Sequence, residues 1–330
     1  MQDARTRLEA ILRERIAVLD GSWGVLIQRQ LRGEEAYRGE RFSDHPRDVA
    51  GDPDLLNLTR PEVVLGIHRD YFAAGADIAT TNTFTATTIG QADYALEAHA
   101  YEMNVAGAQL ARAGGRRGRR LRRRLRRAAE RDAVAVACAS TTRLTGRTRS
   151  TRSRDAYAEQ VRGLAEGGVD FLLIETIFDT LNAKAAIAAA LDDAPELAAL
   201  DLVHRDRPQR PQPLRPDGRR VLALGRARAS RSSSASTARS ARRRCGRSSK
   251  TSRASPRPGW RAIRTRACRT RWARTTSSLG DTSRLLREFA QDGLVNVVGG
   301  CCGTTPEHVK AITDAVQGSD PETGPDRRAR

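Results

Sequence analysis

Residues Val295–Gly303 read VNVVGGCCG, a mostly β-branched run that leads into two adjacent cysteines flanked by glycines. Thr304 and Thr305 follow with hydroxyl groups suited to capping a helix, and Pro306 takes the first helical position. The pattern predicts a buried strand that delivers two thiols to a tight loop, with a helix starting directly after the loop.

The adjacent cysteines, Cys301 and Cys302, allow two interpretations. Neighbouring cysteines do not readily form a disulfide with each other, because the small ring would distort the peptide between them. Two thiolates at the end of a strand can instead share one soft cation such as zinc. The alternative is a buried pair of small apolar residues packed closely by the glycines, since cysteine is often simply buried. The spacing alone leaves both interpretations open.

The composition indicates an enzyme-sized chain with an unusual charge. Its 330 residues can form one large domain of α/β-barrel size or two small ones. The net charge of +19 is typical of a nucleic-acid binder, yet the arginines gather in two blocks, 113–155 and 204–278, and aromatic residues make up only 4%. Five cysteines fit a reducing compartment better than a disulfide framework. Without an 18-residue apolar run or a signal segment at the start, we expect a cytoplasmic protein that does not enter a membrane.

Strand, loop and helix alternate along the chain. Two strands are preceded by similar Gly-x-Asp turns, Gly75–Asp77 and Gly168–Asp170, and this rhythm is typical of parallel βα units. The polar residues at the expected carboxyl ends of four strands are Asp20, Asn82, Glu175 and the pair Cys301 and Cys302. In a (β/α)8 barrel these ends converge on one mouth, so the pattern predicts a TIM barrel with a site there. Taken alone, Asp20 could equally be a turn or cap aspartate.

Five segments resemble the homocysteine-binding barrel of cobalamin-dependent methionine synthases. They are Asp20-Gly21 with Gly24, Arg38–Phe42, Thr81–Phe84, Glu175–Lys184 and Gly299–Pro306. The segments FDTLNAK and GGCCGTTP favour this family over homocysteine methyltransferases that use betaine or S-methylmethionine, which remain the alternative. The sequence departs from the family at Thr80, where a glutamate is usual, and at Ser22-Trp23, where the family has Gly-Met.

The resemblance implies a function and a set of site residues. The activity would be transfer of a methyl group from methylcobalamin to homocysteine, which gives methionine, in a zinc-dependent reaction. Cys301 and Cys302 would be two of the three zinc ligands, and Asp20, Gly21, Asn82 and Glu175 would form the substrate site. The partners would be cobalamin-binding and folate-binding modules, which these 330 residues do not include, with no specific nucleic acid.

The third zinc ligand of this family lies in a GLNCALG loop that the sequence lacks. A shift of one base lets the codons of Ala235–Arg242 spell GLNCALGA, with the cysteine codon straddling Thr237 and Ala238. The same shift lets Ile263–Trp272 spell HPNAGLPNAL, which resembles the next loop of the family. We therefore interpret the basic blocks as frame-shifted. Cys245 and Cys268 are the only thiols near the gap, and neither has a predicted strand to position it.

The basic blocks also bear on the fold. Apart from Ala133–Ala139, which reads as one short strand and gives Cys138 the role of a small buried residue, neither block has the apolar periodicity of a barrel element. We therefore expect an incomplete barrel, with 113–155 and 204–278 anomalous, in one domain over residues 1–317, followed by a disordered tail at 318–330. An arginine-rich nucleic-acid-binding protein is the alternative from another class.

Overall fold

The computed structural model describes residues 4–125, 134–140, 150–175, 180–202, 221–222, 262–265, 279–301 and 303–317. Its strands are β1 (Ala17–Val18), β2 (Ile78–Thr80), β3 (Val134–Ser140), β4 (Phe171–Glu175), β5 (Ala198–Leu202), β6 (Val221–Leu222), β7 (Ala262–Thr265) and β8 (Val297–Gly300). The longer helices are α1 (Ala4–Glu14), α2 (Trp23–Gln30), α5 (Pro61–Ala74), α7 (Ala100–Leu125), α8 (Ser150–Gly167), α9 (Thr180–Asp193), α11 (Leu279–Gln291) and α12 (Pro306–Val316). Short helical turns are α3 (Glu34–Arg38), α4 (Leu56–Thr59), α6 (Thr88–Gln91), η1 (Ala92–Tyr94) and η2 (Glu97–His99).

All strand pairs in the described residues are parallel. One sheet has the order β1-β8-β7 and the other β2-β3-β4-β5-β6, and a parallel bridge between Leu19 and Ile78 joins them. The combined order β7-β8-β1-β2-β3-β4-β5-β6 is that of a (β/α)8 barrel opened between its sixth and seventh strands. In the part of the chain that the structure describes, no pairing joins β6 to β7. The fold is therefore α/β with a parallel sheet, and the described strands do not close into a barrel.

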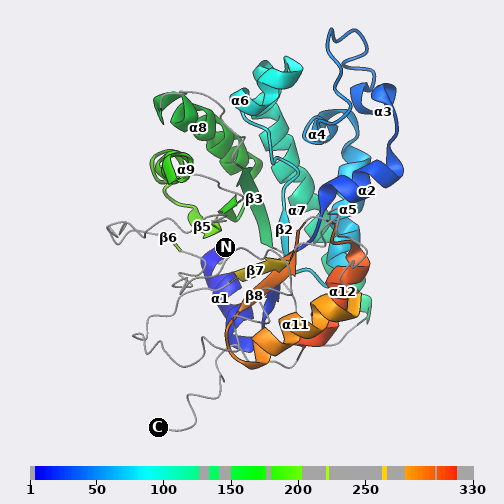
Figure 1. The fold of residues 1–330 in the computed structure, drawn as a ribbon, viewed down its shortest axis with the longest axis vertical. Helices are drawn as coiled ribbons and strands as arrows, with labels where there is room; N and C mark the ends of the chain where they lie inside the picture. Colours follow the sequence, from blue (N-terminus) through cyan, green and yellow to red (C-terminus); the bar gives the residue numbers. More distant parts are fainter. Residues whose placement is uncertain are drawn as a thin grey trace.

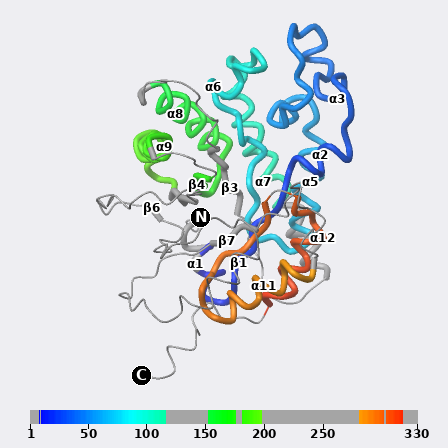
Figure 2. Tube along the Cα trace, in the orientation of Figure 1, coloured from blue at the N-terminus to red at the C-terminus, as the bar shows by residue number. Residues whose placement is uncertain are grey.

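The helices follow the strand order around the outside. Neighbouring contacts run from α11 to α12, then to α5, α7, α8 and α9. Figure 1 shows α8 beside β3, α9 beside β5 and α12 beside β8. Figure 2 traces the same path by residue number, and the blue segment that holds β1 lies beside the orange segment that holds β8, as their pairing requires.

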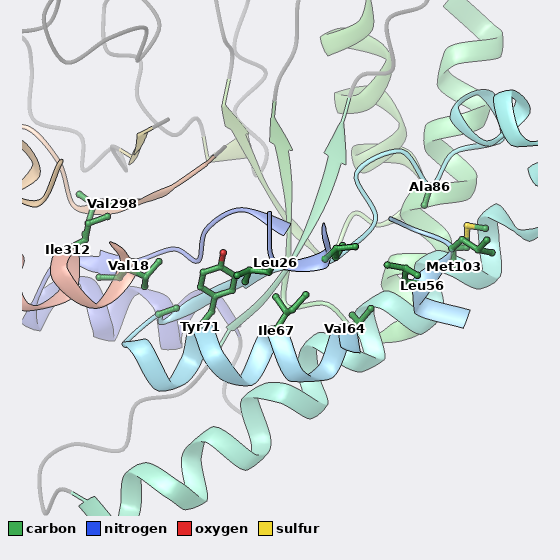
Figure 3. Close-up of a cluster of buried hydrophobic side chains, with 14 of the residues drawn as sticks. Val18, Leu26, Leu56, Val64, Ile67, Tyr71, Ala86, Met103, Val298 and Ile312 are labelled. Atoms are coloured by element: carbon green, nitrogen blue, oxygen red, sulfur yellow. The ribbon is translucent and has the colours of Figure 1, made fainter. Parts of the chain in front are cut away.

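Helix α5 illustrates how the sequence specifies these elements. It begins at Pro61 and ends at Ala74, and its C-cap is Gly75, whose φ of 116° is left-handed and whose N–H donates to the carbonyl groups of Phe72 and Tyr71. Its buried face carries Val64, Ile67, His68, Tyr71 and Phe72, a helical spacing. Figure 3 shows Val64, Ile67 and Tyr71 pointing from α5 into the same apolar cluster as Val18, Leu26, Val298 and Ile312.

The structure corrects one expectation about the first basic block, 113–155. The block contains the second half of α7, the whole of β3 and the start of α8, and β3 lies in register between β2 and β4. Arginine and leucine favour helix, which lets α7 continue through the basic sequence. The prediction of a short strand over Ala133–Ala139 is confirmed by β3. In the second block the described residues are β6 and β7 alone, and the tail 318–330 lies outside the described part.

Candidate functional site

The glycines at the end of β8 allow close packing against β1. A Cβ atom on Gly299 would lie 2.4 Å from the Cβ atom of Leu19, and one on Gly300 would lie 2.0 Å from Cγ2 of Thr304. Both distances are shorter than any normal contact, so only glycine fits at these positions. The sequence therefore brings the loop after β8 directly against the end of β1, where Asp20 lies.

The loop after β8 is a turn closed by Thr304. The N–H of Thr304 donates to the carbonyl oxygen of Cys301 at 3.0 Å, and the N–H of Cys301 donates to Oγ1 of Thr304 at 3.2 Å. Gly303 has a φ of +77°, which suits glycine. Helix α12 then starts at Pro306 with Thr305 as its N-cap, as the sequence predicts. Cys301 is half-buried at the carboxyl end of β8.

The same loop is fastened to the loop after β1. The N–H of Ser22 donates to the carbonyl oxygen of Thr304 at 2.8 Å, and the buried hydroxyl of Tyr71 reaches the carbonyl groups of Ser22 at 2.7 Å and Thr304 at 2.9 Å. A Cβ atom on Gly21 would lie 2.6 Å from the Thr304 oxygen and 2.8 Å from the Tyr71 hydroxyl. Gly21 is thus explained by this close approach.

Asp20 is fully buried at the end of β1 and is bonded to the end of β2. Its carboxylate accepts hydrogen bonds from the N–H of Thr80 at 2.8 Å and from Oγ1 of Thr80 at 3.0 Å. The indole N–H of Trp23 reaches the same Thr80 hydroxyl at 3.4 Å. The two positions at which the sequence departs from the family it resembles, Thr80 and Ser22-Trp23, therefore lie together around Asp20.

Asn82 holds the loop that precedes α4. Its side-chain amide donates to the carbonyl oxygen of Pro53 at 2.6 Å, while Nδ2 of Asn57 donates to the carbonyl oxygen of Asn82 at 2.7 Å. Both asparagines are buried. Asn82 therefore positions a neighbouring loop at the mouth of the sheet.

Glu175 is the last residue of β4 and is buried, at 8% exposure. It lies in register with Ser140 at the end of β3 and Leu202 at the end of β5. Asp20, Asn82, Glu175 and Cys301 thus follow or end four strands at the same edge of the sheet, as predicted.

The predicted metal ligands are only partly within the described residues. Cys301 is described, whereas Cys302 and the positions Thr237 and Ala238, where the third ligand is missing, lie outside. In the described ranges no group of three or more His, Cys, Asp or Glu side chains is arranged to hold a metal ion. The sequence offers two adjacent thiols at a strand end, which suits zinc chemically but falls short of the three protein ligands that a catalytic zinc site uses.

Two buried polar features near this edge are not predicted by the sequence patterns. Asp52 and Asp54 are fully buried in the loop before α4, and His68 is fully buried on α5 with its ring 4.7 Å from that of Trp23. Burial lowers the pKa of His68 to about 3. The Asp-Pro-Asp spacing in a turn was a visible signal for the first feature, whereas a histidine on an amphipathic helix gives no sign of its burial.

Comparison with known proteins decides the family. The model of the homocysteine S-methyltransferase family matches residues 17–215 and 256–316. The chain belongs to the homocysteine S-methyltransferase family. It is therefore an enzyme of a family that methylates homocysteine. The matched ranges include the first basic block and stop on either side of 216–255, the segment that contains Thr237 and Ala238.

Solved structures of the homocysteine methyltransferase MmuM from Escherichia coli share the fold of this homocysteine S-methyltransferase. The metallated form matches with a TM-score of 0.58 and 16% identity, covering 93% of this chain and 99% of MmuM. The oxidized form gives 0.56 and 17% over 93% and 99%, and the apo form 0.54 and 15% over 94% and 99%. None of the helices in the described ranges has both the length and the apolar character to span a bilayer.

Proposed function

We propose that this member of the family is the homocysteine-binding module of a cobalamin-dependent methionine synthase, with methylcobalamin as the methyl donor. The observation that carries the proposal is the Gly299–Thr305 loop, which holds Cys301 at the end of β8 against the end of β1. The segments FDTLNAK and GGCCGTTP support the choice of donor. The cobalamin-binding and folate-binding modules would be partners outside these residues.

In this proposal the chain's carboxylates hold the amino group of homocysteine. Asp20 follows β1 and Glu175 ends β4 at the same edge of the sheet, and a carboxylate is the natural partner of an ammonium group. Gly21 lets Thr304 and Tyr71 pack closely against the loop after β1, because any side chain at this position would meet both of them. Asn82 positions the Pro53 loop rather than the substrate itself.

Cys301 and Cys302 would hold zinc on the side of the site formed by β8. When bound, zinc lowers the pKa of the homocysteine thiol and so presents a thiolate near neutral pH. We also propose that the third ligand was lost when the reading frame shifted around Thr237 and Ala238, which makes zinc binding by this chain weak. An incomplete barrel, open between β6 and β7, belongs to the same proposal and is supported by the strand order.

The test compares this chain with a version in which Ala235–Arg242 is replaced by GLNCALGA. We expect the replaced chain to bind about one zinc ion and homocysteine, and to form methionine from methylcobalamin but not from betaine or S-methylmethionine. The substitutions Cys301→Ser and Cys302→Ser should each remove zinc, whereas Cys245→Ser, the control, should not.

Three outcomes would count against the proposal. Methionine formed from betaine or S-methylmethionine instead of methylcobalamin would assign the other donor class. Zinc that persists in the Cys301→Ser and Cys302→Ser variants would remove the proposed ligands. Tight and sequence-specific nucleic-acid binding that survives 0.2 M salt would favour the binding-protein alternative, because nonspecific phosphate contacts weaken steeply over that range.

A further inference from the structure

The hydroxyl group of Tyr71 joins the loop after β1 to the loop after β8. Tyr71 lies on α5 with 0% exposure, and its hydroxyl group reaches the carbonyl oxygen of Ser22 at 2.7 Å and that of Thr304 at 2.9 Å. Because a phenol has a single hydrogen, the two carbonyl groups share it, and the shared bond forms only while both loops keep one position. This hydroxyl group therefore sets one loop against the other.

Thr304 carries the contact from Tyr71 to the backbone of Cys301. The carbonyl oxygen of Thr304 also accepts from the N–H of Ser22 at 2.8 Å. Its N–H donates to the carbonyl oxygen of Cys301 at 3.0 Å, and its Oγ1 accepts from the N–H of Cys301 at 3.2 Å. Thr304 is thus bonded to α5 and to the loop after β1 on one side and to the cysteine on the other. A shift of Thr304 would move the backbone that carries the Cys301 thiol.

The loop after β1 is tied to the same place from its own side. The N–H of Gly300 donates to the carbonyl oxygen of Asp20 at 3.0 Å. A Cβ atom on Gly21 would lie 2.6 Å from the Thr304 oxygen and 2.8 Å from the Tyr71 hydroxyl, so the two loops and the phenol are in direct contact there. The carboxylate of Asp20 and the thiol after β8 are therefore held at a fixed spacing.

We propose that Tyr71 is a positioning residue that sets this spacing and so determines the length of amino thiol that the enzyme accepts. This role rests on the proposed function, in which Asp20 holds the amino group of homocysteine and Cys301, through zinc, holds its sulfur. A substrate held at both ends must match the spacing of the two sites, and one methylene group changes the affinity by about 10- to 200-fold. Tyr71 acts through the two loops, because its hydroxyl group is bonded to their backbone.

The experiment measures, by calorimetry with excess zinc, the binding of homocysteine and of cysteine, which is one methylene group shorter, to the full chain. We expect the parent protein to bind homocysteine at least about tenfold more tightly than cysteine. Tyr71→Phe keeps the ring and removes the hydroxyl group, so it should narrow this preference to about threefold or less. A purely structural role would weaken the binding of both amino thiols by the same factor and leave their ratio unchanged.

Hydrogen exchange tests the link between the loops without zinc or substrate. The N–H groups of Ser22, Cys301 and Thr304 are bonded within or between the two loops. In Tyr71→Phe these three groups should exchange about tenfold faster, while exchange in α8 stays as in the parent protein. Faster exchange throughout the chain would instead mean a general loss of stability and would contradict the positioning role.

Tyr101→Phe is the matched control, because it removes a tyrosine hydroxyl group that donates to the carboxylate of Glu166 at 2.6 Å in an exposed position. It should leave the preference for homocysteine unchanged. If Tyr71→Phe retains the full preference of the parent protein, the positioning role is wrong, and the proposed function stands. If the parent protein binds no homocysteine, the substrate site of the proposed function is wrong, and the positioning role fails with it.

Discussion

Two buried aspartates, Asp77 and Asp20, lie at opposite ends of the β1 and β2 pair, and they have different hydrogen-bond partners. At the amino end, Asp77 is bonded to the guanidinium group of Arg15 and accepts a hydrogen bond from the N–H of Val18 at 3.0 Å. At the carboxyl end, Asp20 accepts hydrogen bonds from the neutral N–H and hydroxyl of Thr80. Both aspartates are almost completely buried.

The difference between the partners of Asp77 and Asp20 agrees with the usual roles of the two strand ends in parallel α/β folds. Residues at the amino ends of the strands usually hold the fold, and residues at the carboxyl ends usually carry the chemistry. Asp77 has a cationic side chain of its own protein as partner, which suits a structural role. Asp20 accepts hydrogen bonds from Thr80 at the carboxyl end of the strands, which is the end at which the proposed substrate role of Asp20 would be exercised.

The largest expected effect is therefore at the amino end. Asp77→Ala leaves the guanidinium group of Arg15, whose side chain is 18% exposed, without its partner and removes the acceptor of the Val18 N–H. We expect a loss of about 4 kcal/mol in the free energy of unfolding, measured with urea. Asp314→Asn is the control, since the Asp314 side chain is 55% exposed in its pair with Lys310. A loss of less than about 1 kcal/mol in Asp77→Ala would remove the structural role.

The free energy of unfolding should depend on pH through His68, which lies near the carboxyl ends of β1 and β2. The His68 ring packs against Trp23, whose indole reaches Thr80, and Thr80 donates to Asp20. Because burial lowers the His68 pKa from 6.5 to about 3, the unfolded chain binds a proton below pH 6.5 that the folded protein does not. The contribution of His68 to stability is complete above pH 6.5 and is lost as the pH falls toward 3.

His68→Phe isolates this effect. The difference in unfolding free energy between the parent protein and His68→Phe should change by about 2 kcal/mol between pH 6.5 and pH 4.5, to the disadvantage of the parent protein. The comparison is needed because Asp52 and Asp54, whose pKa values are raised, act in the opposite direction. His99→Gln, at a partly exposed histidine, is the control. Parallel pH profiles for the parent protein and His68→Phe would show that His68 is not the sensor.

The sequence predicted the strand ends better than it predicted what surrounds them. Hydrophobic runs and glycine turns indicated β1, β2, β4 and β8, and they placed Asp20, Glu175 and Cys301 at one edge correctly. Those signals are local, because a buried parallel strand must be an apolar run and must end where polar residues begin. The N-cap at Thr305 was also predicted correctly, because the Thr-Pro signal of a helix start is local in the sequence.

Contacts between residues far apart in the chain could not be predicted from the sequence. Nothing in the sequence around Thr80 indicates that its hydroxyl donates a hydrogen bond to Asp20, 60 residues away. Likewise, nothing around Tyr71 indicates that its hydroxyl donates to the carbonyl oxygen of Thr304, 233 residues away. The sequence analysis also underestimated the first basic block, because arginine favours helix and α7 continues into the block as far as Leu125. The frame-shift interpretation stays a prediction, since most of the second block lies outside the described residues.

A medium effect is expected where the two loops at the carboxyl end meet. Gly21→Ala would place its Cβ atom 2.6 Å from the carbonyl oxygen of Thr304 and should lower the unfolding free energy by about 2 kcal/mol. Gly24→Ala is the matched control, because a Cβ atom at Gly24 meets nothing within 4 Å, and it should be neutral or slightly stabilising. Equal effects of the two substitutions would mean that the Gly21 loop is looser than the structure indicates.

The smallest expected change in stability, at Thr80, is also the sharpest test of the comparison. Thr80→Val removes the hydroxyl that donates to Asp20 but keeps the N–H bond at 2.8 Å, so we expect a loss of about 1 kcal/mol in unfolding free energy. If Asp20 holds the amino group of homocysteine, losing this donor should leave the carboxylate less well oriented and weaken homocysteine binding about tenfold in calorimetry. Thr80→Ser retains the hydroxyl and should bind homocysteine normally. Should Thr80→Val bind homocysteine as tightly as Thr80→Ser, the orientation of Asp20 by Thr80 would have no part in substrate binding, and the two ends of the strand pair would be alike in serving only the fold.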